Sequence, residues 1–434
     1  MFEWYRDLDG PRRRTFWACF GGYSLDAMDV QMFSFAMPVL IGLWGLSHTD
    51  AGVLASATLI SSALGGWGAG LLADRIGRVR TLQITVVWFA VFTFLSGMTT
   101  SFEQLLVTRS LQGIGFGGEW ATGSVLIGEM IAGRHRGKAV GIVQSGWAVG
   151  WGAAALLSTV FFIFLPADLA WRVLLFVGIL PAFAALAVRR MVPESALYLK
   201  SRQAGPRPGA LAIFSPRFRG TTVRGCMLAL GLHGGYYAIA TWLPTYLRTE
   251  RQLSVLSTGG YLAVIIIGSF AGYLAAAYLN DFWGRRRTFL LYSVGSLTIA
   301  FSYMLIPVSN GLMLVLGFPL GFFASGIYGG IGPLFTELYP TEVRGSGQGF
   351  CFNFGRGIAA AFPILIGALS TTLGLGGAIG LFATLAYGLV IVMVLLLPET
   401  KGRELELIGQ PLTAHNNGKR SIAGTAAAGG LTRD

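Results

Sequence analysis

Long apolar stretches, separated by charged or Pro/Gly-rich breaks, follow one another along almost the whole chain. A helix that crosses about 30 Å of hydrocarbon needs about 20 residues. Division of the chain at its breaks gives twelve segments of this size, with approximate spans 16–44, 52–73, 80–99, 103–129, 138–165, 170–189, 224–247, 257–279, 288–306, 310–336, 346–373 and 376–397. The pattern predicts an all-α integral membrane protein with twelve transmembrane helices in a lipid bilayer.

The composition agrees with this class. Of 434 residues, 53% are hydrophobic and 12% are charged, which is about half the charged share of a soluble globular domain. The 62 Gly and 16 Pro are spread through the apolar runs, as in transmembrane helices, and this excludes a disordered low-complexity chain. Cys19, Cys226 and Cys351 lie far apart without a CxxC motif. We therefore expect no disulfide framework, no metal site and no cofactor.

The distribution of basic residues predicts the orientation. The net charge is +12, which in a soluble chain would suggest nucleic acid as a partner. If both termini are cytoplasmic, 27 of the 32 Lys and Arg fall on the cytoplasmic side. Arg172, Arg248 and Arg251 fall outside, and Arg109 and Arg356 fall within the membrane. The positive-inside rule thus predicts cytoplasmic termini and gives no reason to expect nucleic acid.

An internal repeat is the most specific feature of the sequence. Three groups of residues recur in the same order after a shift of 205 to 208 positions. They are Asp74, Gly77, Arg78 and Arg80 with Asp281, Gly284, Arg285 and Arg287; Glu129 and Arg136 with Glu337 and Arg344; and Pro193 and Glu194 with Pro398 and Glu399. Such a repeat predicts a duplicated six-helix unit, and hence two pseudo-symmetric six-helix bundles.

The repeat also sets the expected domain boundaries. Residues 1–189 form the N-terminal six-helix bundle, and residues 224–400 form the C-terminal one. Between them, 190–223 is expected to be a cytoplasmic inter-bundle loop. Residues 401–434 are expected to be a cytoplasmic tail without a fixed structure.

Several motifs resemble those of a known family. Residues 70–78 (GLLADRIGR), Arg109-x-x-Gln112-Gly113 and 398–402 (PETKG) resemble the major facilitator superfamily over nearly the whole chain. Within it, 117–120 (GGEW) and Asp26-x-x-Asp29 are similar to the metabolite:H⁺ and aromatic-acid:H⁺ symporters. This resemblance implies that family's two-bundle fold and, as substrates, carboxylates such as benzoates, muconate or nicotinate.

Three carboxylates are the candidates for proton coupling. An ionisable group inside a spanning segment costs about 2.5–3.5 kcal/mol on insertion scales and usually faces a cavity or a partner. Asp26 and Asp29 are three residues apart and share a helix face, so they repel each other in low dielectric, which suits a proton carrier. Asp29 is the deeper one. Glu119 lies among glycines in an apolar setting and is the next candidate. A purely structural role is the alternative for each.

A carboxylate substrate needs a positive site, and arginine supplies two parallel hydrogen bonds with a permanent charge. Arg109 belongs to the fourth-helix motif, where a role in packing or coupling competes with substrate contact. Arg356, in the eleventh segment, stands where the first half has Ala148. This asymmetry favours Arg356 as the substrate-binding residue.

Further polar and aromatic residues complete the expected binding site. His233 is related to Asp26 by the 207-residue shift, which places it at the matching position of the seventh helix. Its neighbours and one face of the fifth helix supply groups that suit a planar acid near the midplane, although such stripes commonly serve packing. The full set is Arg356, Arg109, His233, Tyr236, Tyr237, Gln144, Trp147, Trp151 and Asn353.

The residues of the repeated loops are expected to act as gates. Asp74 can pair with Arg78 or with basic residues of 134–138, which would hold the cytoplasmic side closed in one state. The resemblance implies this role and its repetition in the second half. The gating set is Asp74, Arg78, Glu129, Arg136, Asp281, Arg285, Glu337 and Arg344.

The leading hypothesis is a proton-coupled importer of a small organic carboxylate, aromatic or unsaturated, that works by alternating access. A sugar or polyol symporter, suggested by the PES and PETKG motifs, and a drug or metabolite exporter are the alternatives within the fold. The sequence contains no nucleotide-binding motif, nucleophile elbow or metal-ligand spacing, so neither an enzyme nor a receptor is expected. We expect a monomer in a bacterial inner membrane.

Overall fold

The computed structural model describes residues 3–46, 48–131, 135–183, 192–203, 211–253, 255–402 and 405. Nearly all of the predicted 401–434 tail lies outside these residues, as do residues 190–191 and 204–210 of the predicted 190–223 loop.

Long helices make up the first half of the described chain. A short helix α1 (Glu3–Arg6) comes first. It is followed by α2 (Gly10–Trp44), α3 (His48–Ile76), α4 (Arg78–Ser96), α5 (Phe102–Met130), α6 (Arg136–Phe164), α7 (Ala167–Phe176) and the 3₁₀ turn η2 (Val177–Ile179). Asp9 and Ser101 cap the N-termini of α2 and α5 with their side-chain oxygens, which satisfies backbone N–H groups that have no partner inside the helix.

The second half follows the same scheme with more interruptions. After α9 (Ala196–Gln203) and η3 (Ala212–Phe214) come α10 (Arg219–Thr249), α11 (Val255–Phe282), α12 (Arg285–Leu305), α13 (Asn310–Gly326), η4 (Ile327–Gly330), α14 (Ile331–Leu338), α15 (Arg344–Ala359) and α16 (Ala361–Leu396). Within α16, Gly374 has φ 71° and ψ 162°, a conformation that glycine adopts without steric cost. The chain turns there, so α16 holds parts of both the eleventh and the twelfth predicted segments.

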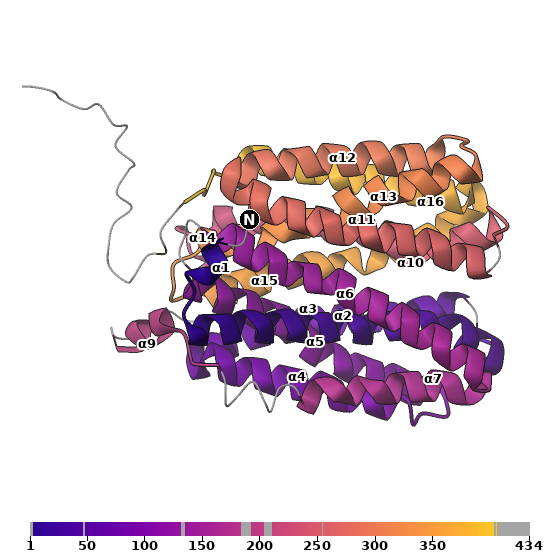
Figure 1. The fold of residues 1–434 in the computed structure, drawn as a ribbon, viewed down its shortest axis with the longest axis horizontal. Helices are drawn as coiled ribbons and strands as arrows, with labels where there is room; N and C mark the ends of the chain where they lie inside the picture. Colours follow the sequence, from indigo (N-terminus) through magenta and orange to yellow (C-terminus); the bar gives the residue numbers. More distant parts are fainter. Residues whose placement is uncertain are drawn as a thin grey trace, which may run out of the picture.

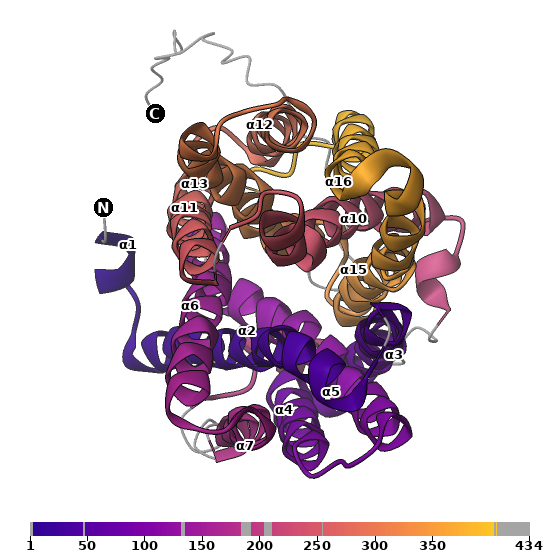
Figure 2. The ribbon, with the colours of Figure 1, turned by 90° about the vertical axis from the view of Figure 1, so that its right-hand side faces the viewer.

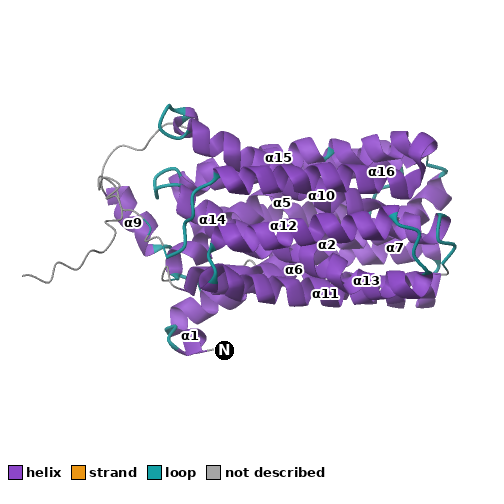
Figure 3. Cartoon of the chain, turned by 90° about the horizontal axis from the view of Figure 1, so that it is seen from above, coloured by secondary structure: helices purple, strands orange, loops and turns teal. Residues whose placement is uncertain are grey.

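The helices run side by side along the longest axis of the molecule (Figure 1). Seen along this axis, α2 to α7 gather on one side and α10 to α16 on the other (Figure 2). Within the first group α3 packs on α5 and α2 on α6, and within the second α10 packs on α16 and α11 on α13. Contacts between the groups run through α3 with α15 and through α6 with α11. The short helices α1, α9 and α14 lie at one end (Figure 3), here called the α14 end.

Seven helices of the described residues are long and apolar enough to cross a membrane. They are Gly52–Ile76, Arg78–Ser96, Arg136–Phe164, Gly259–Phe282, Arg285–Leu305, Asn310–Leu338 and Arg344–Leu396. Large apolar side chains such as Leu64, Ile163 and Leu385 remain exposed on the helices, as expected for a surface that faces lipid. The number of spans and the side of the termini stay predictions.

Glycines bring the helices of the first half into direct backbone contact. A Cβ added at Gly117 of α5 would lie 1.8 Å from the Ser62 carbonyl oxygen of α3. One added at Gly150 of α6 would lie 1.9 Å from the Ser24 carbonyl oxygen of α2. Small residues at such crossings let membrane helices approach closely.

Candidate functional site

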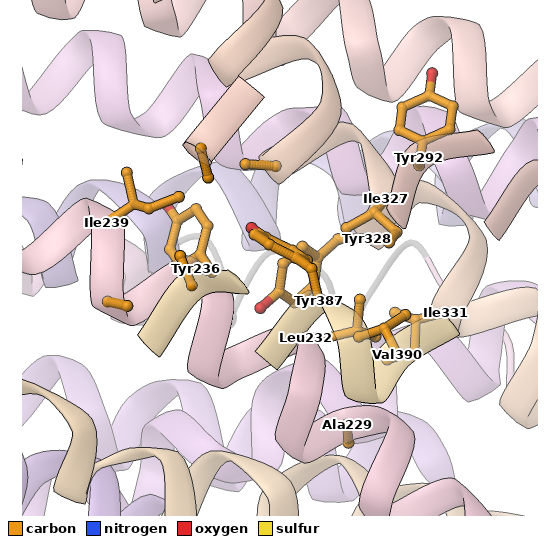
Figure 4. Packing of buried hydrophobic residues seen from close by; sticks show 14 of the residues in the cluster. Ala229, Leu232, Tyr236, Ile239, Tyr292, Ile327, Tyr328, Ile331, Tyr387 and Val390 are labelled. Atoms are coloured by element: carbon orange, nitrogen blue, oxygen red, sulfur yellow. The ribbon is translucent and has the colours of Figure 1, made fainter. Parts of the chain in front are cut away.

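A small central pocket lies between the two groups of helices, with a cavity volume of about 20 Å³, which is room for about one water molecule. Its walls come from α2 and α6 on one side and from α10, α11, η4 and α15 on the other. The lining residues are Tyr23, Trp147, His233, Tyr236, Tyr237, Tyr273, Tyr328, Phe352 and Arg356. Tyr236 and Tyr328 extend toward each other from different helices (Figure 4), with ring centroids 5.6 Å apart. The pocket is thus a mainly aromatic chamber with one charged residue.

Five of the residues expected to bind substrate line this pocket: Arg356, His233, Tyr236, Tyr237 and Trp147. The indole N–H of Trp147 donates to the Tyr236 hydroxyl at 3.0 Å and so joins α6 to α10. The Nδ1 atom of His233 bonds to the Ala229 carbonyl at 2.9 Å.

The other four expected residues lie outside the pocket wall. Gln144 stands behind it: its Nε2 donates to the Tyr328 carbonyl at 3.3 Å and its Oε1 accepts from Trp120 at 3.1 Å. Trp151 is buried in the hydrophobic core. Asn353 donates to the Gly117 carbonyl at 3.3 Å and ties α15 to α5.

Arg109, the remaining member, belongs to a separate polar cluster. Its guanidinium lies 3.9 Å from the centroid of the Phe33 ring, and its charge interacts with that of Asp29. Asp29 in turn accepts a hydrogen bond from Gln112 at 2.7 Å. The two motifs Asp26-x-x-Asp29 and Arg109-x-x-Gln112 therefore meet at Asp29.

Arg356 lies in the pocket with little charge compensation. It is 3% exposed, and its guanidinium stacks 4.5 Å from the Phe116 ring centroid and 4.8 Å from that of Phe352. The Tyr237 hydroxyl interacts with it. Within the described part of the chain, however, Nε and Nη1 have no hydrogen-bond partner, and Arg356 forms no ion pair there. A buried cation with free donors can hold an anionic group.

Two acids, Asp26 and Glu119, interact electrostatically with Arg356. Asp26 is 1% exposed, and among the described residues neither of its carboxylate oxygens has a hydrogen-bond partner. Its charge interacts with those of Glu119, Asp29 and Arg356, and Glu119 also interacts with Arg356. Although Asp26 and Asp29 share a helix, only Asp26 also interacts with Glu119 and Arg356, whereas Asp29 interacts with Arg109.

Four pocket residues were not anticipated from the sequence: Tyr23, Tyr273, Tyr328 and Phe352. Two of them had a usable signal, since Tyr23 lies three residues before Asp26 and Phe352 four residues before Arg356, on the same helix faces. The Phe352 ring also stacks on Trp120 of the other group, at 3.4 Å between centroids and 11° between planes. Tyr273 and Tyr328 come from elements without a polar motif.

At the α14 end, Asp74 holds the first residues of α15 across the two groups. Its Oδ2 accepts from the Ser346 backbone N–H at 2.8 Å and from the Ser346 hydroxyl at 2.6 Å. It also pairs with Arg78 at 3.3 Å. Of the expected partners, Asp74 thus pairs with Arg78. An acidic side chain at a helix N-terminus is stabilised by the helix dipole.

Asp281 makes the equivalent contact in the second half. Its carboxylate accepts from the backbone N–H groups of Gly137 at 3.0 Å and Lys138 at 2.9 Å, at the start of α6. It also pairs with Arg285 at 3.0 Å. The start of α6 is therefore bound by Asp281.

Two buried ion-pair groups cross the same interface. Glu129 pairs with Arg344 at 2.9 Å and with Arg78 at 3.2 Å. Glu337 pairs with Arg136 at 3.0 Å and with Arg285 at 2.7 Å. Removal of one partner would leave a buried charge uncompensated, at a cost of about 3–5 kcal/mol. All eight predicted gating residues thus meet at the α14 end.

The third repeated motif contributes Glu194 and Glu399, which bind the starts of the two helices that carry Arg78 and Arg285. Glu194 accepts from the backbone N–H groups of Arg78 and Val79, at the start of α4. Glu399 accepts from those of Arg285 and Arg286, at the start of α12. Sequence analysis found this repeat without assigning it a role.

At the opposite end, charged side chains bind within their own group. Arg172 of α7 donates to the Gly97 and Thr99 carbonyls. Glu250 accepts from the backbone N–H groups of Leu375 and Gly376, beside the turn in α16. Ion pairs between the two groups are, within the described residues, a feature of the α14 end.

Comparison with known proteins agrees with the motifs. A model of the Major Facilitator Superfamily matches residues 19–311 and 266–424. The chain is 43% identical over 411 residues to the probable 4-methylmuconolactone transporter of Cupriavidus pinatubonensis, covering 94% of this chain and 96% of the relative. It is 32% identical over 376 residues to the cis,cis-muconate transport protein of Acinetobacter baylyi, covering 82% and 86%.

The fold is also similar to a solved structure, that of the proton:xylose symporter XylE bound to 6-bromo-6-deoxy-D-glucose. The TM-score is 0.77 at 19% identity, covering 92% of this chain and 98% of the other. At this identity the likeness concerns the fold. Together with the family match and the relatives, it shows that the chain belongs to the major facilitator superfamily and is a multi-pass membrane transporter, not an enzyme.

Proposed function

We propose that this protein imports a small organic carboxylate together with protons. The observation that carries the proposal is Arg356, a buried guanidinium with free donors at the wall of the central pocket. The relatives named for 4-methylmuconolactone and cis,cis-muconate support an organic acid as the substrate. Arginine recognises a carboxylate through two parallel hydrogen bonds, and the aromatic walls suit an unsaturated or ring-containing body.

The acids near Arg356 supply a route for coupling to protons. Without substrate, the charge of Arg356 favours the ionised forms of Asp26 and Glu119, whereas burial favours their neutral forms. A bound substrate carboxylate would offset the charge of Arg356 and so weaken what favours the ionised forms. Since unpaired buried charge is costly, substrate binding favours proton uptake by Asp26 or Glu119. Asp29 remains a third candidate beside Arg109.

Alternating access would use the contacts at the α14 end as a gate. On this proposal, the bundles 1–189 and 224–400 each contain six of twelve transmembrane helices, and the α14 end faces the cytoplasm with both termini. The Asp74 and Asp281 contacts, with the two crossing ion pairs Glu129–Arg344 and Glu337–Arg136, keep this end closed and break when it opens. The protein acts as a monomer in a bacterial inner membrane.

The alternative substrates explain the pocket less well. A sugar or polyol needs hydroxyl-binding groups but no cation with free donors. An exporter of apolar drugs would bind no anion at Arg356, so the charge of this buried side chain would stay uncompensated, which is costly. The pocket therefore favours the organic acid.

Uptake by the purified protein in proteoliposomes tests the proposal. Labelled 4-methylmuconolactone and cis,cis-muconate serve as probes, with an inward proton gradient as the only driving force. We expect accumulation of at least one acid, its loss with a protonophore, and no uptake by empty vesicles. Equal accumulation with protonophore present and no other ion gradient would contradict proton coupling.

A further inference from the structure

A groove on the outer side of the second group of helices is separate from the central pocket and has no part in the proposed function. Its volume is about 520 Å³, and it is lined by six residues of α12 between Leu290 and Ile299 and by Phe323 of α13. Helix α12 is long and apolar enough to cross a membrane and lies at the edge of the molecule (Figures 1 and 2). We propose that this α12 groove binds one acyl chain of an anionic phospholipid whose phosphate lies at Arg286 and Arg287.

A missing side chain creates the α12 groove. A Cβ added at Gly295 would lie 2.5 Å from the Phe323 ring, so this ring forms the floor of the groove where a side chain would otherwise stand. The 207-residue shift of the repeat relates Gly295 to Trp88 of α4. The Trp88 indole N–H donates to the Leu111 carbonyl at 2.8 Å, and its ring packs on Phe92 with centroids 5.1 Å apart. The first half thus has a large ring at the position that the second half leaves open.

The length and the chemistry of the groove fit a lipid chain. At a rise of about 1.5 Å per residue, the stretch from Leu290 to Ile299 is about 14 Å long, and one leaflet holds about 15 Å of hydrocarbon. Of the lining side chains only that of Thr298 is polar, and Leu291 and Val294 are exposed. An acyl chain in the groove therefore contacts apolar side chains over the depth of one leaflet.

A cation stands at the end of the groove, on the same face of α12. Arg287 precedes Leu291 by four residues and Val294 by seven, which is the spacing of one helix face. Arg287 is exposed, and within the described part of the chain it forms no ion pair. Because helical side chains lean toward the N-terminus, its guanidinium lies beyond Leu291, toward the α14 end. A cation in this place attracts the anionic head of a lipid.

Further groups at the start of α12 add to this charge. Lys401 donates at 2.8 Å to the last carbonyl of α11, and Arg286 donates its backbone N–H to Glu399 at 3.0 Å. The cations Arg286, Arg287 and Lys401 outnumber this acid. Trp283 is exposed just before the helix, as aromatic residues are at the level of lipid headgroups. The site therefore favours a lipid with a net negative charge over a zwitterionic one.

Native mass spectrometry of the purified protein in detergent tests the proposal. Phosphatidylglycerol and phosphatidylcholine with the same acyl chains are offered together, so that the two lipids differ in the net charge of the headgroup. We expect phosphatidylglycerol to remain bound in preference to phosphatidylcholine, with one copy held more tightly than any further copies.

Variants assign the tightly held copy to the groove. Arg287→Gln should weaken its binding about fivefold, and Val294→Trp, which places a ring in the groove, should displace it. The matched control is Arg80→Gln, because Arg80 is the exposed counterpart of Arg287 in the repeat, on the helix that carries Trp88. This control should leave the tightly held copy in place.

The outcomes distinguish a built site from general surface charge. A loss of equal size in Arg80→Gln and Arg287→Gln overturns the proposal, as does equal binding of the two lipids. Unchanged binding in Arg287→Gln overturns the position of the phosphate, and unchanged binding in Val294→Trp overturns that of the chain. A protein dimer that is lost in Val294→Trp would make a second copy of this chain the occupant and overturns the lipid. None of these results depends on Arg356, so the proposed function is tested separately.

Discussion

Arg356 and Arg109 are both buried arginines stacked on phenylalanine rings, yet their surroundings differ. Arg109 interacts with Asp29, which also accepts a hydrogen bond from Gln112. Arg356 lines the pocket, and its Nε and Nη1 atoms have no hydrogen-bond partner among the described residues. Asp26 and Glu119 interact with it electrostatically. The sequence favoured Asp29 as proton carrier because of its depth. In the structure, neither carboxylate oxygen of Asp26 has a hydrogen-bond partner among the described residues, and the charge of Asp26 interacts with that of Arg356.

Asp26→Asn tests this residue. The change removes a charge that we propose to be neutralised whenever substrate binds, so coupling should be lost while binding persists. We expect accumulation driven by a proton gradient to disappear and counterflow exchange to remain. Asp168→Asn, the same change at an exposed residue of α7, is the control. Normal accumulation by Asp26→Asn would exclude Asp26 as an essential carrier.

The helix crossings determine where the pocket residues stand. Gly117 lets α5 contact the backbone of α3, and Asn353 of α15 donates to the carbonyl of this same glycine. The crossing therefore aligns α15, which carries Phe352 and Arg356, with α5, which carries Glu119 and Trp120. Periodicity in the sequence located these helices, but it could not give their depth or rotation, which depend on contacts between distant segments.

Gly117→Ala should disrupt this crossing. The added Cβ would lie 1.8 Å from the Ser62 oxygen, and since both are backbone-fixed, α3 and α5 must separate. Overpacking of this kind costs about 1–3 kcal/mol or more. Thermal unfolding in detergent should show a lower midpoint than for Gly42→Ala, a helical position with no atom within 4 Å. Equal midpoints for the two variants would disprove the tight crossing.

Over the whole molecule, the repeat in the sequence corresponds to two matching sets of contacts at the α14 end. The motifs identified the family, and this is confirmed. They also indicated the acids and arginines that meet there. Asp74 pairs with Arg78, one of its expected partners, but single motifs do not reveal that each aspartate also binds a helix start in the opposite half. Tyr273 and Tyr328 of the pocket were missed because they lie in apolar stretches without a spacing signal.

Asp74→Asn tests the gate. A hydrogen bond to a charged group contributes about 1.5–3 kcal/mol, so the closed α14 end should lose about tenfold or more of its population relative to the open one. We expect ligand binding within a few-fold of normal and a sharp fall in transport, with a similar result for Asp281→Asn. Asp9→Asn, at the exposed start of α2, should have little effect. Loss of binding with normal folding would place Asp74 in the substrate site.

The central claim is that Arg356 holds the substrate carboxylate, and its most direct test compares binding of the transported acid and of its primary amide. The natural protein should prefer the acid, and Arg356→Ala should lose about 1.5–3 kcal/mol of binding, roughly ten- to a hundredfold in affinity, together with this preference. Arg356→Lys should recover only part, since an ammonium cannot reproduce two parallel hydrogen bonds. If Arg356→Ala still distinguishes acid from amide as the natural protein does, the carboxylate is held elsewhere and the account is contradicted.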